Sequence, residues 1–287
     1  MQLEHITPLI LTFNEARNIQ RTLNHLTWAR QIIVIDSFST DETLDILSYY
    51  PNVRVYKRPF DTHATQWNFG IDRVATEWCL SLDADYILTS EPLYELQQLQ
   101  PLDAIDGYYF PFKYCVFGKP LRGTIMPPRQ ALFRKDRARY IDDGHTQLLR
   151  VKGQSGALSS YIHHDDRKPL KYWLWAQDRY ALLEAQKLTT TPHNQLNFAD
   201  KIRKTKTIAP FVVLFYCLVL KGGILDGWRG WYYAAQRTMA ELLLLIRLIE
   251  QDSKRGVQVN HEELGMGDAY EIVIRTPSPV LGKTKNE

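Results

Sequence analysis

The stretch EWCLSLDADYIL, residues 77–88, is an apolar run that ends on two acidic residues, Asp83 and Asp85. Residues two apart on an extended chain project to the same side, so the two carboxylates repel each other unless a cation or a proton lies between them. Hard divalent ions such as Mg²⁺ and Mn²⁺ prefer oxygen ligands and are often shared between carboxylates and a diphosphate. The spacing therefore predicts a metal site that holds a diphosphate. The alternative is a pair of solvated turn aspartates.

Two further polar motifs also follow apolar runs. In LTFNEARNI a run ends near Thr12 and leads into Asn14 and Glu15, and in VIDSFSTDET a run ends at Asp36. A carboxylate such as Asp36 can accept hydrogen bonds from a base N–H group or a ribose hydroxyl. Asn14 and Thr40 could instead only cap helices. The sequence contains no Gly-x-Gly-x-x-Gly and no Gly-Lys-Ser/Thr motif, which excludes the usual dinucleotide-binding and P-loop sites.

Strand and helix patterns alternate through the first third of the chain. Apolar runs of strand length predict strands that are buried on both faces of a parallel sheet: residues 6–13, 31–36, 53–58 and 77–85. Between them the spacing is helical, with Ile19, Leu23 and Leu26 on one face, for example. The βαβ order predicts an α/β fold with right-handed crossovers, in which ligands bind at the carboxyl ends of the strands. All three polar motifs would then meet at one edge of the sheet.

The pattern changes after Pro101. The stretches GYYFPFKYCVFG (107–118) and RQALFRKDRARYID (129–142) predict strands that extend the sheet in antiparallel fashion. From Pro169 the chain has a helical pattern, and its aromatic stripe is expected to lie in the core: Trp173, Trp175 and Tyr180. The predicted organisation is an α/β catalytic domain, a helical region and a mixed, partly disordered tail, over residues 1–168, 169–255 and 256–287.

Composition sets broad limits. The chain has 287 residues, 45% of them hydrophobic, and a net charge of +3, so it can bury a large core and is not a nucleic-acid-binding polycation. Its three cysteines, Cys79, Cys115 and Cys217, are odd in number and far apart, which predicts reduced thiols in a cytosolic protein. The first residues, MQLEHITPLILTFNEA, lead directly into a strand pattern and are not expected to be a secretory signal.

Four stretches, taken in chain order, resemble the motifs of the family 2 nucleotide-sugar glycosyltransferases: LTFNEARNI, IIVIDSFSTDET, THATQWNFGID and LSLDAD. The resemblance is greatest to the branch that contains lipopolysaccharide-core β-glucosyltransferases. The resemblance covers residues 5–180 and implies the Rossmann-like GT-A fold, with a mostly parallel sheet, an antiparallel extension and a C-terminal helical appendage. The family usually has glycine where Phe38 stands, and a ring there would reshape the base pocket. The residues that the resemblance assigns to the nucleotide sugar are Thr12, Asn14, Glu15, Asp36, Gln66, Asn68, Asp83 and Arg167.

The same resemblance implies a bound Mg²⁺ or Mn²⁺. Asp83 and Asp85 would hold it on the diphosphate, and a late histidine often completes such a site. In YIHHDDRKPL we assign that role to His164, with His163 behind it; the alternative is a solvated charged loop before a helix that starts at proline. Three cationic residues could neutralise the leaving diphosphate: Arg129, Arg167 and Lys168.

The segment YIDDGHTQLL supplies the candidate base, since the resemblance places it after the antiparallel strands. The predicted base is Asp143, with His145 assisting acceptor or diphosphate binding, while Asp142 and His145 stay open as bases. Many relatives carry a His-Glu pair here, whereas this chain has Thr146 after the histidine. The alternative is an ordinary Asp-Gly turn beside a surface histidine.

Basic and aromatic residues surround the apolar run IAPFVVLFYCLVL (208–220): KIRKTK (201–206) precedes it, and Trp228, Trp231 and Tyr232 follow it. The run is shorter than the roughly 20 residues that span a bilayer, and this composition is typical of an interfacial helix on anionic lipid. Together with the resemblance it predicts a cytoplasmic protein, bound peripherally to the cytoplasmic face of the inner membrane. The alternatives are a helix packed on the catalytic domain and a surface for a homodimer.

These features together predict an inverting, metal-dependent glycosyltransferase. It would move a sugar from a nucleotide diphosphate, with a UDP-sugar as the expected donor, to a hydroxyl of a glycolipid or cell-envelope glycan, as in lipopolysaccharide biosynthesis. One alternative is a polyprenyl-phosphate glycosyltransferase, whose acceptor phosphate needs no strong base. Another is a catalytically inactive nucleotide-binding scaffold, which the departures at Phe38 and Thr146 allow.

Overall fold

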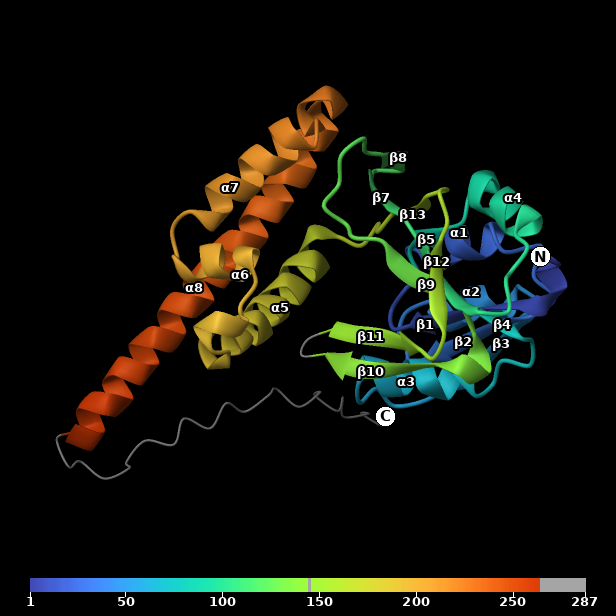
Figure 1. Cartoon of the computed structure of the whole chain (residues 1–287), viewed down its shortest axis with the longest axis horizontal. Helices are drawn as coiled ribbons and strands as arrows, with labels where there is room; N and C mark the ends of the chain where they lie inside the picture. Colours follow the sequence, from blue (N-terminus) through green and yellow to red (C-terminus); the bar gives the residue numbers. More distant parts are fainter. Residues whose placement is uncertain (144–145, 264–287) are drawn as a thin grey trace, which may run out of the picture.

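The computed structural model of the chain describes residues 1–143 and 146–263. Figure 1 shows an α/β body and, beside it, a layer of helices made by the C-terminal part of the chain. The central sheet has the strand order β12-β6-β9-β4-β1-β2-β3. Its middle is parallel: β1 (Ile6–Thr12) lies between β4 (Trp78–Asp83) and β2 (Ile32–Asp36), and β3 (Val53–Lys57) pairs with β2.

The parallel strands form a two-sided core. Side chains alternate between the two faces of a strand, so Leu9 and Ile33 pack with α3 (His63–Ile71), whereas Ile10 packs with α1 (Ile19–Asn24) on the other face. All of these apolar side chains on β1 and β2 are buried, as expected for strands covered on both faces. The other helices of the body are short: η1 (Leu3–His5), α2 (Thr43–Ser48), α4 (Ser90–Gln98) and η2 (Lys135–Arg137).

The antiparallel extension is also present, and the predicted α/β fold class is therefore confirmed. β9 (Arg129–Arg134) pairs antiparallel with both β4 and β6 (Ile105–Phe110), and β12 (Gln154–Ala157) adds a strand outside β6. β10 (Ala138–Asp143) and β11 (Thr146–Val151) form a hairpin. A smaller sheet has the order β5-β13-β7-β8: Tyr86–Ile87, Ile162–His164, Phe112–Val116 and Lys119–Pro120.

The C-terminal helices form their own layer beside the body (Figure 1). Their bounds are α5 (Leu170–Thr190), η3 (His193–Gln195), α6 (Phe198–Lys204), α7 (Ala209–Phe215), a π-helical turn η4 (Tyr216–Leu220), η5 (Gly223–Asp226) and α8 (Trp228–Glu263). The long helices α5 and α8 pack through small and aliphatic side chains, among them Ala185, Leu188, Leu244 and Leu248. α8 runs beyond the predicted boundary at residue 255. Within the described residues, no helix is long and apolar enough to cross a membrane.

Glycines turn the chain between α7 and α8. Gly222 and Gly227 have φ values of +71° and +59°, which favour glycine. A Cβ atom on Gly230 would lie 1.7 Å from the carbonyl oxygen of Gly223, so only glycine lets α8 approach this turn so closely. The turn therefore fixes how α7 doubles back along α8.

The expectation that the aromatic stripe of α5 lies in the core is wrong. Trp175 and Tyr180 are 59% and 46% exposed. α5 instead packs on α8 through Ala181 and Ala185, whose small side chains let the two helices approach. The aromatic side chains lie on the other sides of α5, because helical packing uses only one stripe of the helix.

Candidate active site

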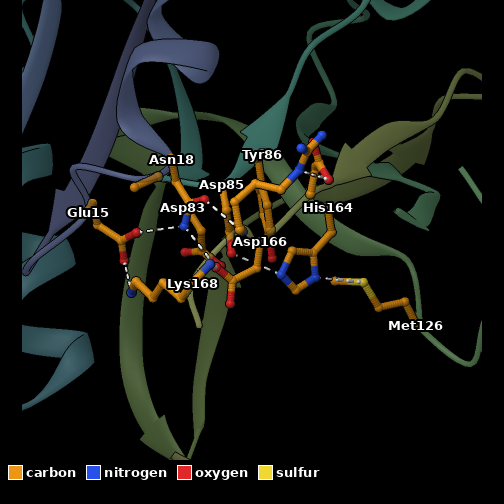
Figure 2. Close-up of polar contacts among 12 residues, drawn as sticks. Glu15, Asn18, Asp83, Asp85, Tyr86, Met126, His164, Asp166 and Lys168 are labelled. Carbon is orange, nitrogen blue, oxygen red and sulfur yellow. Dashed lines mark hydrogen bonds and ion pairs between the residues drawn. The ribbon is translucent and has the colours of Figure 1, made fainter. Parts of the chain in front are cut away.

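The carboxyl ends of β1, β2 and β4 lie next to one another. In the strand register Thr12 is opposite Asp36, and Leu11 is opposite Asp83. The three polar motifs that follow these strands therefore meet at one edge of the sheet, as the parallel topology requires. Figure 2 shows the polar contacts that connect this edge to residues 164–168.

Asp36 organises the loop that follows β2. Its carboxylate is fully buried and accepts hydrogen bonds from Thr12 Oγ1 (2.8 Å) and from Ser39 N and Oγ (2.8 and 2.6 Å). Both oxygens are thus used within the chain. Asp36 therefore fixes the loop after β2, which is the loop predicted to bind the base and the ribose.

Asn14 and Thr40 do not cap helices, so that alternative is wrong for both residues. Asn14 has a φ of 55°, and its side-chain oxygen accepts a hydrogen bond from Thr40 N at 2.8 Å. Its own N–H donates to Ser39 Oγ at 2.9 Å. The helices that follow begin later, at Ile19 and Thr43. Asn14 therefore ties the loop after β1 to the loop after β2.

The two predicted donor residues on α3 have different surroundings. Gln66 is buried and donates to Ser37 Oγ (2.8 Å) and to the carbonyl of Arg58 (3.2 Å), so it supports the loop after β2. Asn68 points elsewhere: its amide donates to the carbonyl of Tyr140 and accepts from Tyr140 N, both at 2.9 Å. The structure does not bring Asn68 to the edge of the sheet but uses it to join α3 to β10.

Glu15 is part of a network with the segment after β13 (Figure 2). Its carboxylate lies 2.5 Å from Lys168 Nζ and accepts from Asn18 Nδ2 at 3.0 Å. The same Asn18 amide donates to Asp166 at 2.9 Å. Sequence reasoning missed Asn18 and Asp166. The available signal was that Asn18 follows Glu15 by one helical turn and precedes the buried Ile19, so a polar side chain there needs partners.

Burial and charge set the titration of this network. Burial raises the pKa of Glu15 to about 7; the Lys168 ammonium works against this shift, and the nearby Asp85 carboxylate adds to it. Burial would lower the pKa of Lys168, but the Glu15 carboxylate raises it overall. Lys168 therefore stays charged beside a carboxyl group that titrates near neutral pH.

The two predicted metal-binding aspartates have separate partners. Asp85 Oδ2 lies 3.0 Å from His164 Nε2, and Asp83 Oδ2 lies 3.4 Å from Arg129. Burial would raise the pKa of Asp85 and lower that of His164, yet their contact shifts each the other way overall. Where the structure describes the chain, no three His, Cys, Asp or Glu side chains already form a metal-binding group.

These residues nevertheless fit a divalent cation. Asp85 Oδ1 is buried and has no hydrogen-bond partner within the described part of the chain. Asp83 ends β4 and Asp85 lies in the turn that follows it, and the His164 imidazole is already in contact with Asp85. An unsatisfied carboxylate oxygen beside a second carboxylate and an imidazole is a donor set that Mg²⁺ or Mn²⁺ accepts.

The three predicted cationic residues differ in whether they contact the carboxylates of the site. Arg129 contacts the site, because it reaches Asp83 and donates to the Tyr86 hydroxyl at 2.6 Å. Lys168 contacts it through Glu15. The guanidinium of Arg167 instead holds the buried Asp165 with two hydrogen bonds, at 2.9 and 2.8 Å. The structure therefore does not bring the charged end of Arg167 to Asp83 or Asp85.

The predicted base lies on the hairpin of β10 and β11. Asp143 pairs with Thr146 in the backbone register at the tip, and Asp142 is exposed one residue earlier. His145 and the side chain of Asp143 lie outside the described residues, so their roles stay predictions. Asn68 fixes the hairpin to α3 through Tyr140, whose hydroxyl lies 2.8 Å from Ser81 Oγ on β4.

Comparison with known proteins decides the family. The family model described as "Glycosyl transferase family 2" matches residues 9–152, half of the chain. This chain belongs to glycosyl transferase family 2. The matched range contains the strand-end motifs from Thr12 to Asp85, so the resemblance found in the sequence is confirmed.

Several curated relatives are glycosyltransferases. An uncharacterized glycosyltransferase of Rickettsia bellii is 33% identical over 104 residues, 36% of this chain and 35% of the relative. SunS of Bacillus subtilis is 34% identical over 89 residues, 30% of this chain and 21% of SunS. The lipopolysaccharide core biosynthesis glycosyltransferase LpsC of Rhizobium meliloti is 26% identical over 84 residues, 28% of this chain and 31% of LpsC. The matched segments span about a third or less of these relatives.

Similar solved structures are more distant. The crystal structure of S. aureus TarS 1–349 in complex with UDP-GlcNAc has 13% sequence identity and a TM-score of 0.45, and the match covers 94% of each chain. Glucosyl-3-phosphoglycerate synthase from Mycobacterium tuberculosis, in a complex with Mn²⁺ and UDP, has 15% identity and a TM-score of 0.42, with 64% of this chain and 78% of that chain covered.

Replacing Glu15 by glutamine should change how stability depends on pH. The pKa of Glu15 is raised from 4.5 to about 7 in the folded protein, so the folded state binds the Glu15 proton more tightly than the unfolded state. The stability that this proton contributes is fully present below pH 4.5 and is lost as the pH rises to 7. Relative to wild type, Glu15→Gln should therefore gain unfolding free energy between pH 4.5 and 7.5, by up to about 3 kcal/mol. Urea unfolding at the two pH values measures this.

Glu95→Gln is the matched control. Ser159 and Ser160 donate to the Glu95 carboxylate, and although burial opposes them, its pKa is lowered overall. Its contribution to stability is therefore lost only below pH 4.5, and the difference from wild type should stay flat from pH 4.5 to 7.5. If Glu15→Gln instead loses stability relative to wild type as the pH rises, the ion pair with Lys168 dominates and the raised pKa is wrong.

Proposed function

We propose that this protein is an inverting, metal-dependent glycosyltransferase that uses a UDP-sugar and a hydroxyl acceptor of a glycolipid or cell-envelope glycan. The observation that carries the proposal is the pair Asp83 and Asp85 at the carboxyl edge of the parallel sheet, with His164 in contact with Asp85. Family membership supports sugar transfer. The name of LpsC, a lipopolysaccharide core biosynthesis enzyme, supports a cell-envelope acceptor.

The donor would bind between the loops after β1 and β2. Thr12, Asn14 and Ser39 hold these loops together around the buried Asp36, and Gln66 supports them from α3. Asn14 and Ser39 lie at the surface of this arrangement and can offer polar groups to a base or ribose. Phe38, half exposed with a φ of 61°, lies in the same loop and can stack on a flat base.

Asp83, Asp85 and His164 would hold the cation. When bound, the metal stabilises negative charge on the leaving diphosphate. Arg129 and Lys168, now paired with Asp83 and Glu15, are positioned to exchange a carboxylate for a phosphate oxygen. A protonated Glu15 would release Lys168 for this exchange, which fits a carboxyl group that titrates near pH 7.

The acceptor would approach from the side of the β10–β11 hairpin. In an inverting transfer the acceptor oxygen bonds to the anomeric carbon as the bond from that carbon to the diphosphate breaks, and a base takes the acceptor's proton. We assign the base to Asp143, with His145 assisting and Asp142 as the alternative on the same hairpin. Asn68 positions this hairpin through Tyr140.

The metal assignment predicts the behaviour of UDP binding. Mn²⁺ should strengthen UDP binding to wild type, and Asp83→Asn or Asp85→Asn should remove at least about 100-fold of that metal-dependent affinity, because each substitution removes an anionic ligand. Titration calorimetry with UDP, with Mn²⁺ or with EDTA, measures the effect. Asp136→Asn, an exposed aspartate in η2, is the control and should bind like wild type. Equal UDP affinity in Mn²⁺ and EDTA would contradict the assignment.

The base assignment predicts the effect of charge removal on the hairpin. Asp143→Asn should lower kcat by about 10²- to 10⁴-fold with UDP affinity unchanged, whereas Asp142→Asn should change kcat by less than about tenfold. Steady-state sugar transfer and calorimetry measure the two quantities. Substantial activity of Asp143→Asn would favour the polyprenyl-phosphate alternative, whose acceptor needs no strong base. UDP binding by wild type without any turnover would favour the inactive scaffold.

We also propose that the end of the helical layer contacts anionic lipid. The α7 surface is a set of apolar side chains, each at least half exposed: Ile208, Phe211, Phe215, Val219, Leu220, Ile224, Leu225, Trp228 and Trp231. Lys221 lies beside the Tyr216 ring, and Arg229 lies 4.5 Å from the centre of the Trp228 ring. Exposed aromatic and aliphatic side chains next to cations are the composition of an interfacial contact. This contact would hold the protein on the cytoplasmic face of the inner membrane.

Phe211→Ser combined with Phe215→Ser should weaken vesicle binding by about tenfold or more, since each side chain otherwise buries an apolar ring in lipid. Co-sedimentation with vesicles of phosphatidylglycerol and phosphatidylcholine measures this, and binding should fall as salt rises. Phe198→Ser is the control, because Phe198 is 79% exposed but lies on α6, outside the α7 surface. Unchanged binding by the double variant would contradict the lipid contact.

A further inference from the structure

α8 exposes a regular apolar stripe that contacts the rest of the described chain at one end, where the Tyr232 ring lies 5.6 Å from the Phe117 ring. Along this helix the exposed apolar positions are separated alternately by three and four residues. They form the α8 seam: Tyr232, Ala235, Met239, Leu242, Ile246 and Ile249. The large side chains among them are between 37% and 51% exposed. Alternating steps of three and four residues are the heptad repeat of coiled coils, in which positions a and d face a partner helix.

The seam is distinct from the face of α8 that packs within the chain. That face carries Ala234, Glu241, Leu244 and Leu248, which are 5% exposed or less. Leu244 and Leu248 pack on α5, and Glu241 accepts hydrogen bonds from Arg203 on α6. α8 thus has an inner stripe that holds the helical layer together and an outer stripe. In the outer stripe Tyr232 contacts the Phe117 ring, and the positions from Ala235 to Ile249 have no described contact outside α8.

The shape of the seam favours a helix as its partner. It extends over residues 232–249, about 26 Å of helix, and beyond Trp231 at its first end the exposed large apolar side chains follow one row of a and d positions. A helix that lies in a lipid interface has a broader apolar face and cations along its borders. The borders of the seam are mixed: Arg229 and Gln236 at one end, Glu250 and Asp252 at the other.

We propose that the α8 seam binds the α8 seam of a second copy of this chain, with the two helices antiparallel. Antiparallel pairing places each a position beside a d position. Met239 then meets the partner's Leu242, Ala235 meets the partner's Ile246, and Tyr232 meets the partner's Ile249. The Ala235–Ile246 pair and the Tyr232–Ile249 pair therefore each join a residue near one end of the seam to a residue near the other end. Parallel pairing would instead place Ala235 on the partner's Ala235 and leave a void in that layer.

The charges that border the seam agree with this orientation. In the antiparallel register Arg229 lies beside the partner's Glu250, and the two-fold symmetry repeats the pair. Within the described chain no carboxylate forms an ion pair with Arg229, and its buried Nε has no hydrogen-bond partner there. Glu250 is 47% exposed and contacts only Arg247 on its own helix among the described ion pairs. In parallel pairing Glu250 would face the partner's Leu245.

The first test is the mass of the full chain in solution. By light scattering after size exclusion, wild type should be a dimer at micromolar concentration, and Leu242→Glu combined with Ile246→Glu should be a monomer with the same helical content. Phe198→Glu places the same charge at an exposed apolar residue of α6 and should stay dimeric. A monomeric wild type would overturn the proposal.

The second test is specific for orientation. Arg229→Glu and Glu250→Arg should each weaken the dimer by about tenfold, because each places like charges together at both ends, and the two changes in one chain should restore it. With Met239→Cys and Leu242→Cys in separate chains, oxidation should link only mixed dimers. A disulfide-linked dimer of Met239→Cys alone, or no rescue by the charge exchange, would overturn the antiparallel arrangement.

The same variants also distinguish the proposed dimer from a membrane role of the seam. If Leu242→Glu with Ile246→Glu lost vesicle binding while its mass equalled that of wild type, the seam would be a lipid contact and the dimer proposal would fail. If the dimer forms, vesicle binding should still depend on Phe211 and Phe215. The result is also independent of catalysis, because no seam residue contacts the described carboxylate network.

Discussion

Negative charge gathered at the edge of a parallel sheet requires positive charge nearby, and this requirement organises the end of the molecule where the site lies. The carboxylates come from the first half of the fold, and their partners come from later segments. Asp83 contacts Arg129 on β9, Asp85 contacts His164 on β13, and Glu15 contacts Lys168 just before α5. The pairs of Asp85 with His164 and of Glu15 with Lys168 are largely buried, whereas Asp83 and Arg129 are more exposed. All three pairs connect segments that lie far apart in the sequence.

The same arrangement prepares the site for an anionic ligand. In the proposed function, an incoming diphosphate would replace a carboxylate as the partner of Arg129 or Lys168. Hydrogen bonds to uncharged groups hold the surroundings of the cluster: Asp36 accepts from Thr12 and Ser39, and Asn68 holds the hairpin through Tyr140. Fixed loops beside exchangeable ion pairs are a favourable design for binding a charged donor before reaction.

The helical layer separates its tasks by helix face. One stripe of α8 packs on α5 and α6, another carries the heptad positions from Tyr232 to Ile249, and the end near Trp228 joins the exposed apolar surface of α7. Gly223 and Gly230 make the tight turn that brings α7 alongside α8. An assembly interface and a lipid contact can therefore occupy neighbouring parts of one layer without using the sheet edge.

The sequence alone determined the α/β class, the parallel strands and the meeting of Asp36 and Asp83 at one edge, because hydrophobic periodicity and strand ends are local properties. Only the tertiary structure decided that Asn68 joins α3 to β10, that the Arg167 guanidinium holds Asp165, and that Trp175 is exposed. A side chain's partner comes from whichever segment folds against it, and the packed face of a helix depends on its neighbour. Neither is encoded in the spacing of residues along one element.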